Sequence, residues 1–163
     1  MRKADLEDIP RIRDLAQLAF RATYRDILSP QQLEYMMEMM YSAESLRRQM
    51  TEEHNTFFIE EGKGYVSFRP DGNVGPVAVY HLEKLYVLPE WQKTGLGRRL
   101  FNHIVEEVRR AADGKPARLE LNVNRRNPAL EFYEHIGMRR DRQGDFPIGN
   151  GYYMNDYIMA LDL

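Results

Sequence analysis

The sequence predicts an α/β fold in which a mixed central β-sheet is flanked by helices. Three observations predict it. Apolar residues recur at helical spacing through the N-terminal part of the chain, β-rich runs alternate with helical patterns after it, and the longest β-rich run leads directly into a glycine-containing loop and an amphipathic helix. A chain of 163 residues suits one compact core, so we expect a single domain over residues 1–163.

The N-terminal part is predicted to be mostly helical. After a short strand over 1–4, apolar residues repeat at helical spacing from Leu6 to Phe20. A second helical stripe begins at Ser29-Pro30, and a third short helix is expected over 43–50. The first quarter of the chain should therefore supply helices that cover the sheet.

Three strands are predicted next. Residues 56–60 and 65–68 flank a Gly-Lys-Gly turn, a pattern typical of a β-hairpin. A Pro-Asp-Gly-Asn turn at 70–73 then leads into a long strand over 77–87. Strict alternation gives this strand two faces, with Val79, His81, Glu83, Leu85 and Val87 on one and Tyr80, Leu82, Lys84 and Tyr86 on the other.

The C-terminal half alternates helices and strands. A helical stripe from Leu96 to Val108 can lie on the sheet, and a Gly-Lys-Pro run at 114–116 ends it. A later short helix opens with Asn127 as N-cap and Pro128 at its first position, and Gly137 closes it. The remaining expected elements are strands over 118–123, 138–142 and 152–161, with a glycine-rich loop over 144–151.

Composition excludes several partners and sites. The net charge is −2 with 29% charged residues, so no global basic field attracts nucleic acid or anionic membranes. No apolar run approaches the roughly 20 residues needed to span a bilayer, and the N-terminus lacks the apolar core of a signal peptide, so we expect a cytoplasmic protein. There is no cysteine, and the four histidines show no ligand spacing, so we expect no disulfide and no metal site.

A glycine loop between the long strand and the following helix is the main candidate site. Gly95 and Gly97 have no Cβ, so the backbone can present several N–H groups to an anion, and the helix N-terminus adds its positive dipole end. A Walker loop would need Lys and Ser or Thr after the last glycine, and a dinucleotide loop would need a small residue where Leu100 stands. For these two glycines alone, a plain strand-to-helix turn is an equally good interpretation.

Spacing identifies the family that this loop resembles. Gln92-x-x-Gly95-x-Gly97 is similar to the acetyl-CoA pyrophosphate loop of the GCN5-related N-acetyltransferases (GNAT). A second segment, with Asn127-Pro128-Ala129, Phe132-Tyr133 and Gly137-Met138, resembles another element of that family, which ends in Gly-Phe. Two motifs in the right order favour a ligand-binding site over the plain turn. The closest likeness within the family is to PaiA-like spermidine/spermine acetyltransferases.

The resemblance implies the GNAT fold, in which splayed central strands form the acetyl-CoA cleft. Backbone groups of Leu85, Tyr86 and Val87 would face the pantetheine arm and the acetyl carbonyl, with the Val87 N–H as oxyanion donor. Asn122 or Asn127 could bond the pantetheine amides, although helix capping is an equal alternative for Asn127. The implied pyrophosphate site comprises Gln92, Lys93, Thr94, Gly95, Leu96, Gly97 and Arg98, with Arg99 nearby; a solvated helix face is the alternative for the two arginines.

Catalysis would need a proton acceptor for the amine and a proton donor for the thiolate. By resemblance Tyr133 is the donor, and a phenol with a pKa of about 10 suits an alkyl thiolate; the alternative is a core tyrosine bonded to backbone. Glu83 is the candidate base, and the alternative is a strand carboxylate paired with Lys84 or His81. His81 is a reserve base. Without cysteine, direct attack in a ternary complex is favoured.

The acceptor is left open between several amines. A polyamine or another small primary amine is the first expectation, although Lys84 stands where animal spermidine acetyltransferases carry an acid. Peptide N-terminal amines, or a non-catalytic module that senses acetyl-CoA, are the alternatives. The loop over 144–151 could wall the acceptor site or join a homodimer. Carboxylates that could hold a polycation are Glu34, Glu38, Glu83, Asp145 and Asp156.

Overall fold

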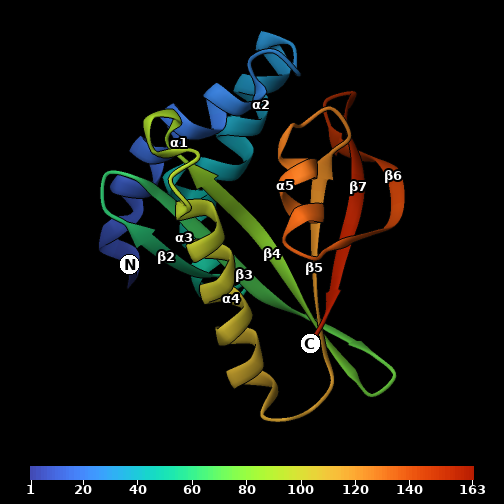
Figure 1. Cartoon of the computed structure of the whole chain (residues 1–163). Helices are drawn as coiled ribbons and strands as arrows, with labels where there is room; N and C mark the ends of the chain where they lie inside the picture. Colours follow the sequence, from blue (N-terminus) through green and yellow to red (C-terminus); the bar gives the residue numbers. More distant parts are fainter.

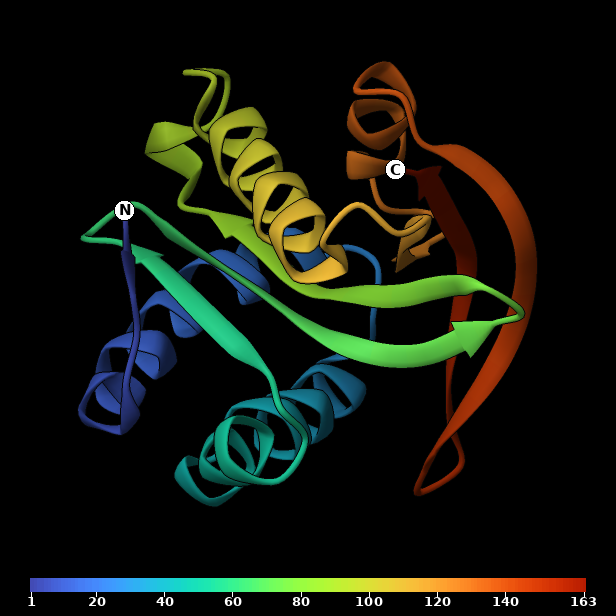
Figure 2. The same ribbon diagram turned by 90° about the horizontal axis from the view of Figure 1, so that it is seen from below.

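The computed structural model describes all 163 residues, and it places one seven-stranded sheet between two layers of helices (Figures 1 and 2). The strand order is β1-β2-β3-β4-β5-β7-β6, and β4 with β5 is the only parallel pair. The predicted mixed sheet flanked by helices is confirmed. The strands are β1 (Arg2–Lys3), β2 (Thr56–Glu60), β3 (Gly64–Val74), β4 (Val77–Val87), β5 (Ala117–Asn124), β6 (Arg139–Gly149) and β7 (Tyr152–Asp162).

Five helices form the two outer layers. They are α1 (Ile9–Tyr24), α2 (Pro30–Tyr41), α3 (Ala43–Thr51), α4 (Leu96–Ala112) and α5 (Ala129–His135), with short 3₁₀ turns at Leu6–Asp8 and Pro89–Trp91. Figure 2 shows α4 on one face of the sheet and α1 with the helices after it on the other. None of these helices is both long and apolar enough to cross a lipid bilayer.

Two separate hydrophobic cores hold the layers together. Leu100 and Ile104 of α4 are fully buried with Leu119 of β5, while Ile12 of α1 and Leu46 of α3 are fully buried on the opposite face. Removing such side chains from water contributes about 1.5–3 kcal/mol each. Both faces of the central strands are therefore covered, as their apolar composition predicts.

Side-chain caps mark the first residues of α2 and α3, which lie on the face of the sheet opposite α4. The Ser29 hydroxyl accepts from the Gln32 N–H at 3.1 Å, with Pro30 at the first helical position, so the predicted start of α2 is confirmed. The Ser42 hydroxyl accepts from the Ser45 N–H at 3.1 Å and opens α3 directly after α2 ends. These caps satisfy N–H groups that a helix leaves without an internal partner.

A β-bulge in β4 makes the predicted strict alternation wrong. Lys84 pairs with Ser67 and Leu82 pairs with Phe68, so Glu83 has no partner on β3. As a result Leu82 and Leu85 both pack in the core beneath α4, while Lys84 lies on the α3 side. One extra residue in a strand shifts every later side chain to the other face.

Two turns also lie elsewhere than predicted. The turn expected at 70–73 is replaced by continued strand, and the chain turns at 75–76, where Gly75 has a φ of 58°. Most of the expected loop over 144–151 is strand, because β6 pairs with β7 as far as Gly149 opposite Tyr152. Regular pairing in a long hairpin outweighs the loop preference of single glycines.

Candidate active site between the diverging strands

An opening in the sheet forms where β4 and β5 diverge. The two strands pair only from Ala78 opposite Ala117 to His81 opposite Glu120. Beyond that point β4 keeps β3 on one side and has no strand on the other, and Figure 1 shows β4 and β5 spreading apart. The expected splay is confirmed. Peptide groups on the open side, over 82–87, are available to a ligand because a strand edge carries unpaired N–H and C=O groups.

The glycine loop lies at the wide end of this opening. Gly95 is the N-cap of α4, and its φ of 85° is one that residues with a Cβ rarely adopt. Arg99 is the first residue whose N–H bonds back into the helix, to the Gly95 carbonyl at 3.1 Å. The N–H groups of Leu96, Gly97 and Arg98 have no partner in the protein. Such a row of free donors at a helix N-terminus is a ready anion site.

Other loop residues maintain its shape. The Gln92 side-chain amide donates to the Val87 carbonyl at 3.3 Å, and the Thr94 hydroxyl donates to the Trp91 carbonyl at 2.6 Å. A Cβ added to Gly97 would lie 3.5 Å from the Phe132 ring, so Gly97 permits close packing of α4 and α5. Gln92 and Thr94 therefore fold the loop against the end of β4.

Three exposed cations surround the free N–H groups. Lys93, Arg98 and Arg99 make no ion pair in the structure. The absence of acidic partners leaves their charge available to a phosphate. Together with the helix dipole, they make this end of the opening electropositive.

Three tyrosines from different elements meet at the opening. Tyr133 on α5 is 7% exposed, and its hydroxyl makes no hydrogen bond in the protein. Burial, with a smaller effect of Tyr24, raises the pKa of Tyr133 above its usual value. Tyr24 ends α1, and its ring centroid lies 6.5 Å from that of Tyr86 on β4. A core tyrosine bonded to backbone was the alternative for Tyr133, and no such bond is present.

The two predicted asparagines are already engaged within the protein. The N-cap of α5 is Pro128 and not Asn127 as predicted, because the helix begins one residue later; the Asn127 side chain still accepts from the Ala129 N–H, the first of the helix, at 2.9 Å. Its side-chain amide also lies 3.5 Å from the Tyr24 hydroxyl. Asn122 donates to Asp156 on β7 at 3.2 Å. Contacts of either asparagine with pantetheine stay a prediction.

Glu83 lies at the bulge near the narrow end of the opening. Its partner is neither Lys84 nor His81: Arg69 Nε donates to Glu83 Oε1 at 2.5 Å, and Arg69 also binds Asp71 at 2.7 Å. The Glu83 side chain is 25% exposed. Its second oxygen, Oε2, makes no hydrogen bond. The Oε2 atom of Glu83 is therefore free to accept a hydrogen bond or a proton from a ligand.

Two basic residues near Glu83 on β4, Lys84 and His81, are largely buried. Burial lowers the pKa of Lys84 to about 8, and its Nζ donates to Gln49 Oε1 at 2.7 Å. Burial also lowers the pKa of His81, whose Nδ1 is 3.9 Å from Asp71 Oδ2. The role of His81 as a reserve base stays a prediction.

Sequence reasoning missed two residues at this site. Tyr24 continues the helical stripe one turn after Phe20, and that spacing was a usable signal. Arg126 donates to the Ile27 carbonyl at 3.0 Å, which ties the segment after α1 to the segment before α5. An arginine in a polar loop gives no pattern from which such a long-range contact could be predicted.

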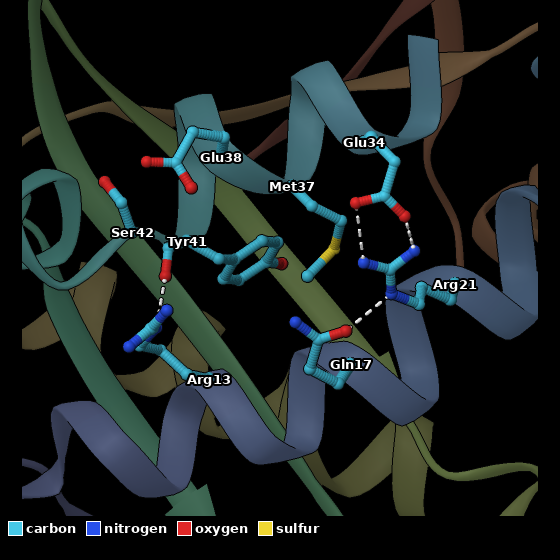
Figure 3. Close-up of a pocket in the computed structure, with 8 residues that line it drawn as sticks. All are labelled: Arg13, Gln17, Arg21, Glu34, Met37, Glu38, Tyr41 and Ser42. Carbon is cyan, nitrogen blue, oxygen red and sulfur yellow. Dashed lines mark hydrogen bonds and ion pairs between the residues drawn. The ribbon is translucent and has the colours of Figure 1, made fainter. Parts of the chain in front are cut away.

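A separate pocket between α1 and α2 does not belong to the opening (Figure 3). It measures about 110 Å³, and no lining residue comes from β4, β5, α4 or α5. Arg21 binds Glu34 across it, and Arg13 donates to the Tyr41 carbonyl at 3.0 Å. Glu34 and Glu38 therefore line this pocket and not the opening.

Comparisons with known proteins agree with this geometry. Residues 24–158 match the family model described as an acetyltransferase (GNAT) domain. The PaiA N-acetyltransferase of Thermoplasma acidophilum, solved with coenzyme A, is 21% identical with a TM-score of 0.75, over 99% of this chain and 97% of that one. Two further acetyltransferase structures are similar; each alignment covers 99% of this chain and 91% of the other chain.

The first of these is the ribosomal-protein-S18-alanine N-acetyltransferase of Escherichia coli, with 23% identity and a TM-score of 0.64. The second is the spermidine N-acetyltransferase SpeG of Vibrio cholerae, with 18% identity and a TM-score of 0.62. At these identities the likeness establishes a shared fold, and the acceptors of those proteins differ from one another.

Proposed function

The chain belongs to the GNAT acetyltransferase family, and from that premise we propose that it moves the acetyl group of acetyl-CoA to a small primary amine. It is an N-acetyltransferase with acetyl-CoA as cosubstrate. The observation that carries the proposal is the divergence of β4 from β5 beside the free N–H groups that begin α4. The wide end of this opening suits a pyrophosphate, and we assign catalysis to Tyr133 on α5 and Glu83 at the bulge of β4.

Acetyl-CoA would bind along the open side of β4. The N–H groups of Leu96, Gly97 and Arg98, with the charges of Lys93 and Arg98, would hold the pyrophosphate. Peptide groups of Leu85, Tyr86 and Val87 would bond the pantetheine arm, and the Val87 N–H would stabilise the oxyanion. This use of unpaired strand groups resembles the addition of a further strand to a sheet edge.

Proton transfers would be divided between two side chains. Glu83 would accept a proton from the acceptor ammonium, directly or through water, because Arg69 leaves its Oε2 free. Tyr133 would donate its proton to the departing thiolate, since its buried hydroxyl makes no hydrogen bond in the protein and is protonated at neutral pH. The amine would attack the thioester directly, because the chain has no cysteine to form an acyl-enzyme.

Anchoring of the β6–β7 hairpin favours a small acceptor, such as a polyamine, over a protein. The Tyr35 hydroxyl donates to the Ile148 carbonyl at 2.6 Å, and the Gln32 side chain donates to the Tyr153 carbonyl at 2.8 Å. The hairpin is thereby tied to α2. A hairpin held against a helix leaves less room for a folded partner than a free loop would.

Thiol release from acetyl-CoA tests the proposal. Purified protein is mixed with spermidine, spermine, amino sugars, amino acids or short peptides. We expect release with one class of small amine. Release only with peptides would instead favour N-terminal acetylation, as in the alanine acetyltransferase to which this chain is similar. Acetyl-CoA binding without release across the panel would favour a sensor module.

A further inference from the structure

Asp156 of β7 carries a buried carboxylate that the protein does not fully satisfy. The residue is 1% exposed. Its Oδ2 accepts from the Asn122 side chain at 3.2 Å, whereas Oδ1 is shielded from water and has no hydrogen-bond partner. Buried carboxylate oxygens are rarely left in this state, because an unpaired charge in a protein interior is costly.

No cation forms an ion pair with this carboxylate, although Arg125 Nη1 lies 3.4 Å from the backbone carbonyl of Asp156. Arg125 is the basic residue that influences it, but the Arg125 guanidinium is directed to the Asp145 carboxylate at 2.6 Å and to backbone carbonyls. Burial consequently raises the pKa of Asp156, and Asn122 and Arg125 oppose this only in part. The Asp156 carboxylate therefore has one free acceptor atom, Oδ1, and an incompletely compensated charge, and both suit the binding of one external cation.

Register places Asp156 beside the opening. It pairs with Asn124 of β5, four residues beyond the last β5 residue that pairs with β4. Directly opposite residues in an antiparallel pair share a face, so Asn124, Asp156 and Gly144 of β6 lie together. The Phe146 ring covers Gly144, which places an aromatic wall next to the carboxylate.

Tyr24 connects this carboxylate to the catalytic candidate. A negative charge on Asp156 contributes to the raised pKa of Tyr24, and Tyr24 in turn raises that of Tyr133. Burial is the main cause in both cases. Contacts also link Tyr24 to this part of the sheet: the Asn127 side-chain amide lies 3.5 Å from the Tyr24 hydroxyl, the Asn127 N–H donates to the Asn124 carbonyl at 2.9 Å, and Asn124 pairs with Asp156.

We propose that Asp156 Oδ1 binds the ammonium group of the acceptor amine, which makes Asp156 a specificity-determining residue for cationic acceptors. This inference rests on the proposed function. An ammonium supplies the donor that Oδ1 lacks and a full positive charge at the carboxylate, which Arg125 compensates only in part. Aliphatic carbons next to the ammonium would meet the Phe146 ring. Binding at Asp156 would hold the amine nitrogen near Tyr133 while Glu83 accepts its proton.

Asp156→Asn tests the inference because asparagine has the same shape and can still accept from Asn122. We expect the KM of the amine acceptor to rise about tenfold or more, as for loss of a charged hydrogen bond. Acetyl-CoA affinity should be unchanged. The melting temperature should rise by about 2–4 °C, because the substitution removes a buried charge. A merely structural carboxylate would give the opposite thermal shift.

Glu120→Gln is the matched control. Glu120 is also a buried carboxylate on this sheet, 6% exposed, but Arg142 binds it at 2.9 Å. That variant should melt at a lower temperature and keep the acceptor KM. An unchanged acceptor KM or a lower melting temperature in Asp156→Asn overturns this inference alone. Failure of the parent protein to release thiol with any amine overturns the proposed function, and the inference with it.

Discussion

Lys84 donates from its buried Nζ to Gln49 Oε1 at 2.7 Å, and this neutral amide is its only hydrogen-bond partner. The side chains of Phe57 and Tyr41 present ring faces at 5.5 and 5.7 Å from the same nitrogen. The β-bulge at Glu83 directs Lys84 to this place, because it shifts the alternation of β4 by one residue. A lysine cation is thus enclosed in the core beneath α3.

This enclosure predicts a pH-dependent stability. The pKa of Lys84 is lowered to about 8 in the folded protein, below its value of 10.5 when exposed. The folded state therefore releases the proton first, and stability rises with pH between these two values. Relative to Lys84→Met, which cannot titrate, the parent protein should gain about 2 kcal/mol of unfolding free energy between pH 7 and pH 9.5. Urea titrations at both pH values measure the gain.

Lys115→Met is the control for that experiment, because Lys115 is exposed in the turn after α4. Its difference from the parent should not change with pH. A constant difference between Lys84→Met and the parent would show that Lys84 is not charged in an enclosed site.

Gly95→Val should abolish or greatly weaken acetyl-CoA binding. A β-branched residue cannot adopt a φ of 85° without a cost of about 1–2 kcal/mol, so the loop would move and its free N–H groups would lose alignment. We expect the Kd of acetyl-CoA to rise about tenfold or more by calorimetry. Gly114→Val is a matched control, since Gly114 has a φ of 78° at the other end of the same helix. It should cost similar stability and leave the Kd unchanged.

Local patterns predicted helix starts and the position of the glycine loop better than they predicted strand pairing. Ser29, Asn127 and Gly95 act through contacts within a few residues, so helix starts and the glycine loop could be read from the sequence. The bulge at Glu83 and the length of the β6–β7 hairpin depend on partner strands distant along the chain. No local pattern encodes such pairing, and strict alternation or glycine content then misleads.

The electrostatic partners were predicted least well. The partner of Glu83 is Arg69, which β3 brings across the sheet, whereas the alternative considered from the sequence was a pair with Lys84 or His81. The free oxygen of Asp156 could not be foreseen, because a lack of partners becomes visible only when every neighbouring element is in place.

Tyr133→Phe should lower kcat by about 10²–10⁴-fold, the usual contribution of a general acid, while the KM of acetyl-CoA changes little. Since the Tyr133 hydroxyl makes no hydrogen bond in the protein, unfolding free energy should stay within about 0.5 kcal/mol. Tyr80→Phe removes a hydroxyl from the same core and should leave kcat unchanged. Equal kcat values for the two variants would remove Tyr133 from the mechanism.

Glu83→Gln should lower kcat about 10²-fold or more, because glutamine keeps the bond to Arg69 but cannot accept the amine's proton. Steady-state kinetics with saturating amine measure the change. Asp71→Asn is the control, since Asp71 is the other carboxylate that Arg69 binds, at 2.7 Å. That variant should keep kcat if Arg69 serves only to orient Glu83.

The same measurement separates the roles of two carboxylates, Glu83 at the bulge of β4 and Asp156 on β7. Loss of kcat in Glu83→Gln with a raised acceptor KM in Asp156→Asn assigns proton transfer to the bulge on β4 and amine binding to β7. If Glu83→Gln retains full kcat and Asp156→Asn loses it, the carboxylate with the free buried oxygen both binds the ammonium and accepts its proton. The raised pKa of Asp156 would suit it to that second task, because a base accepts protons more readily as its pKa approaches the working pH.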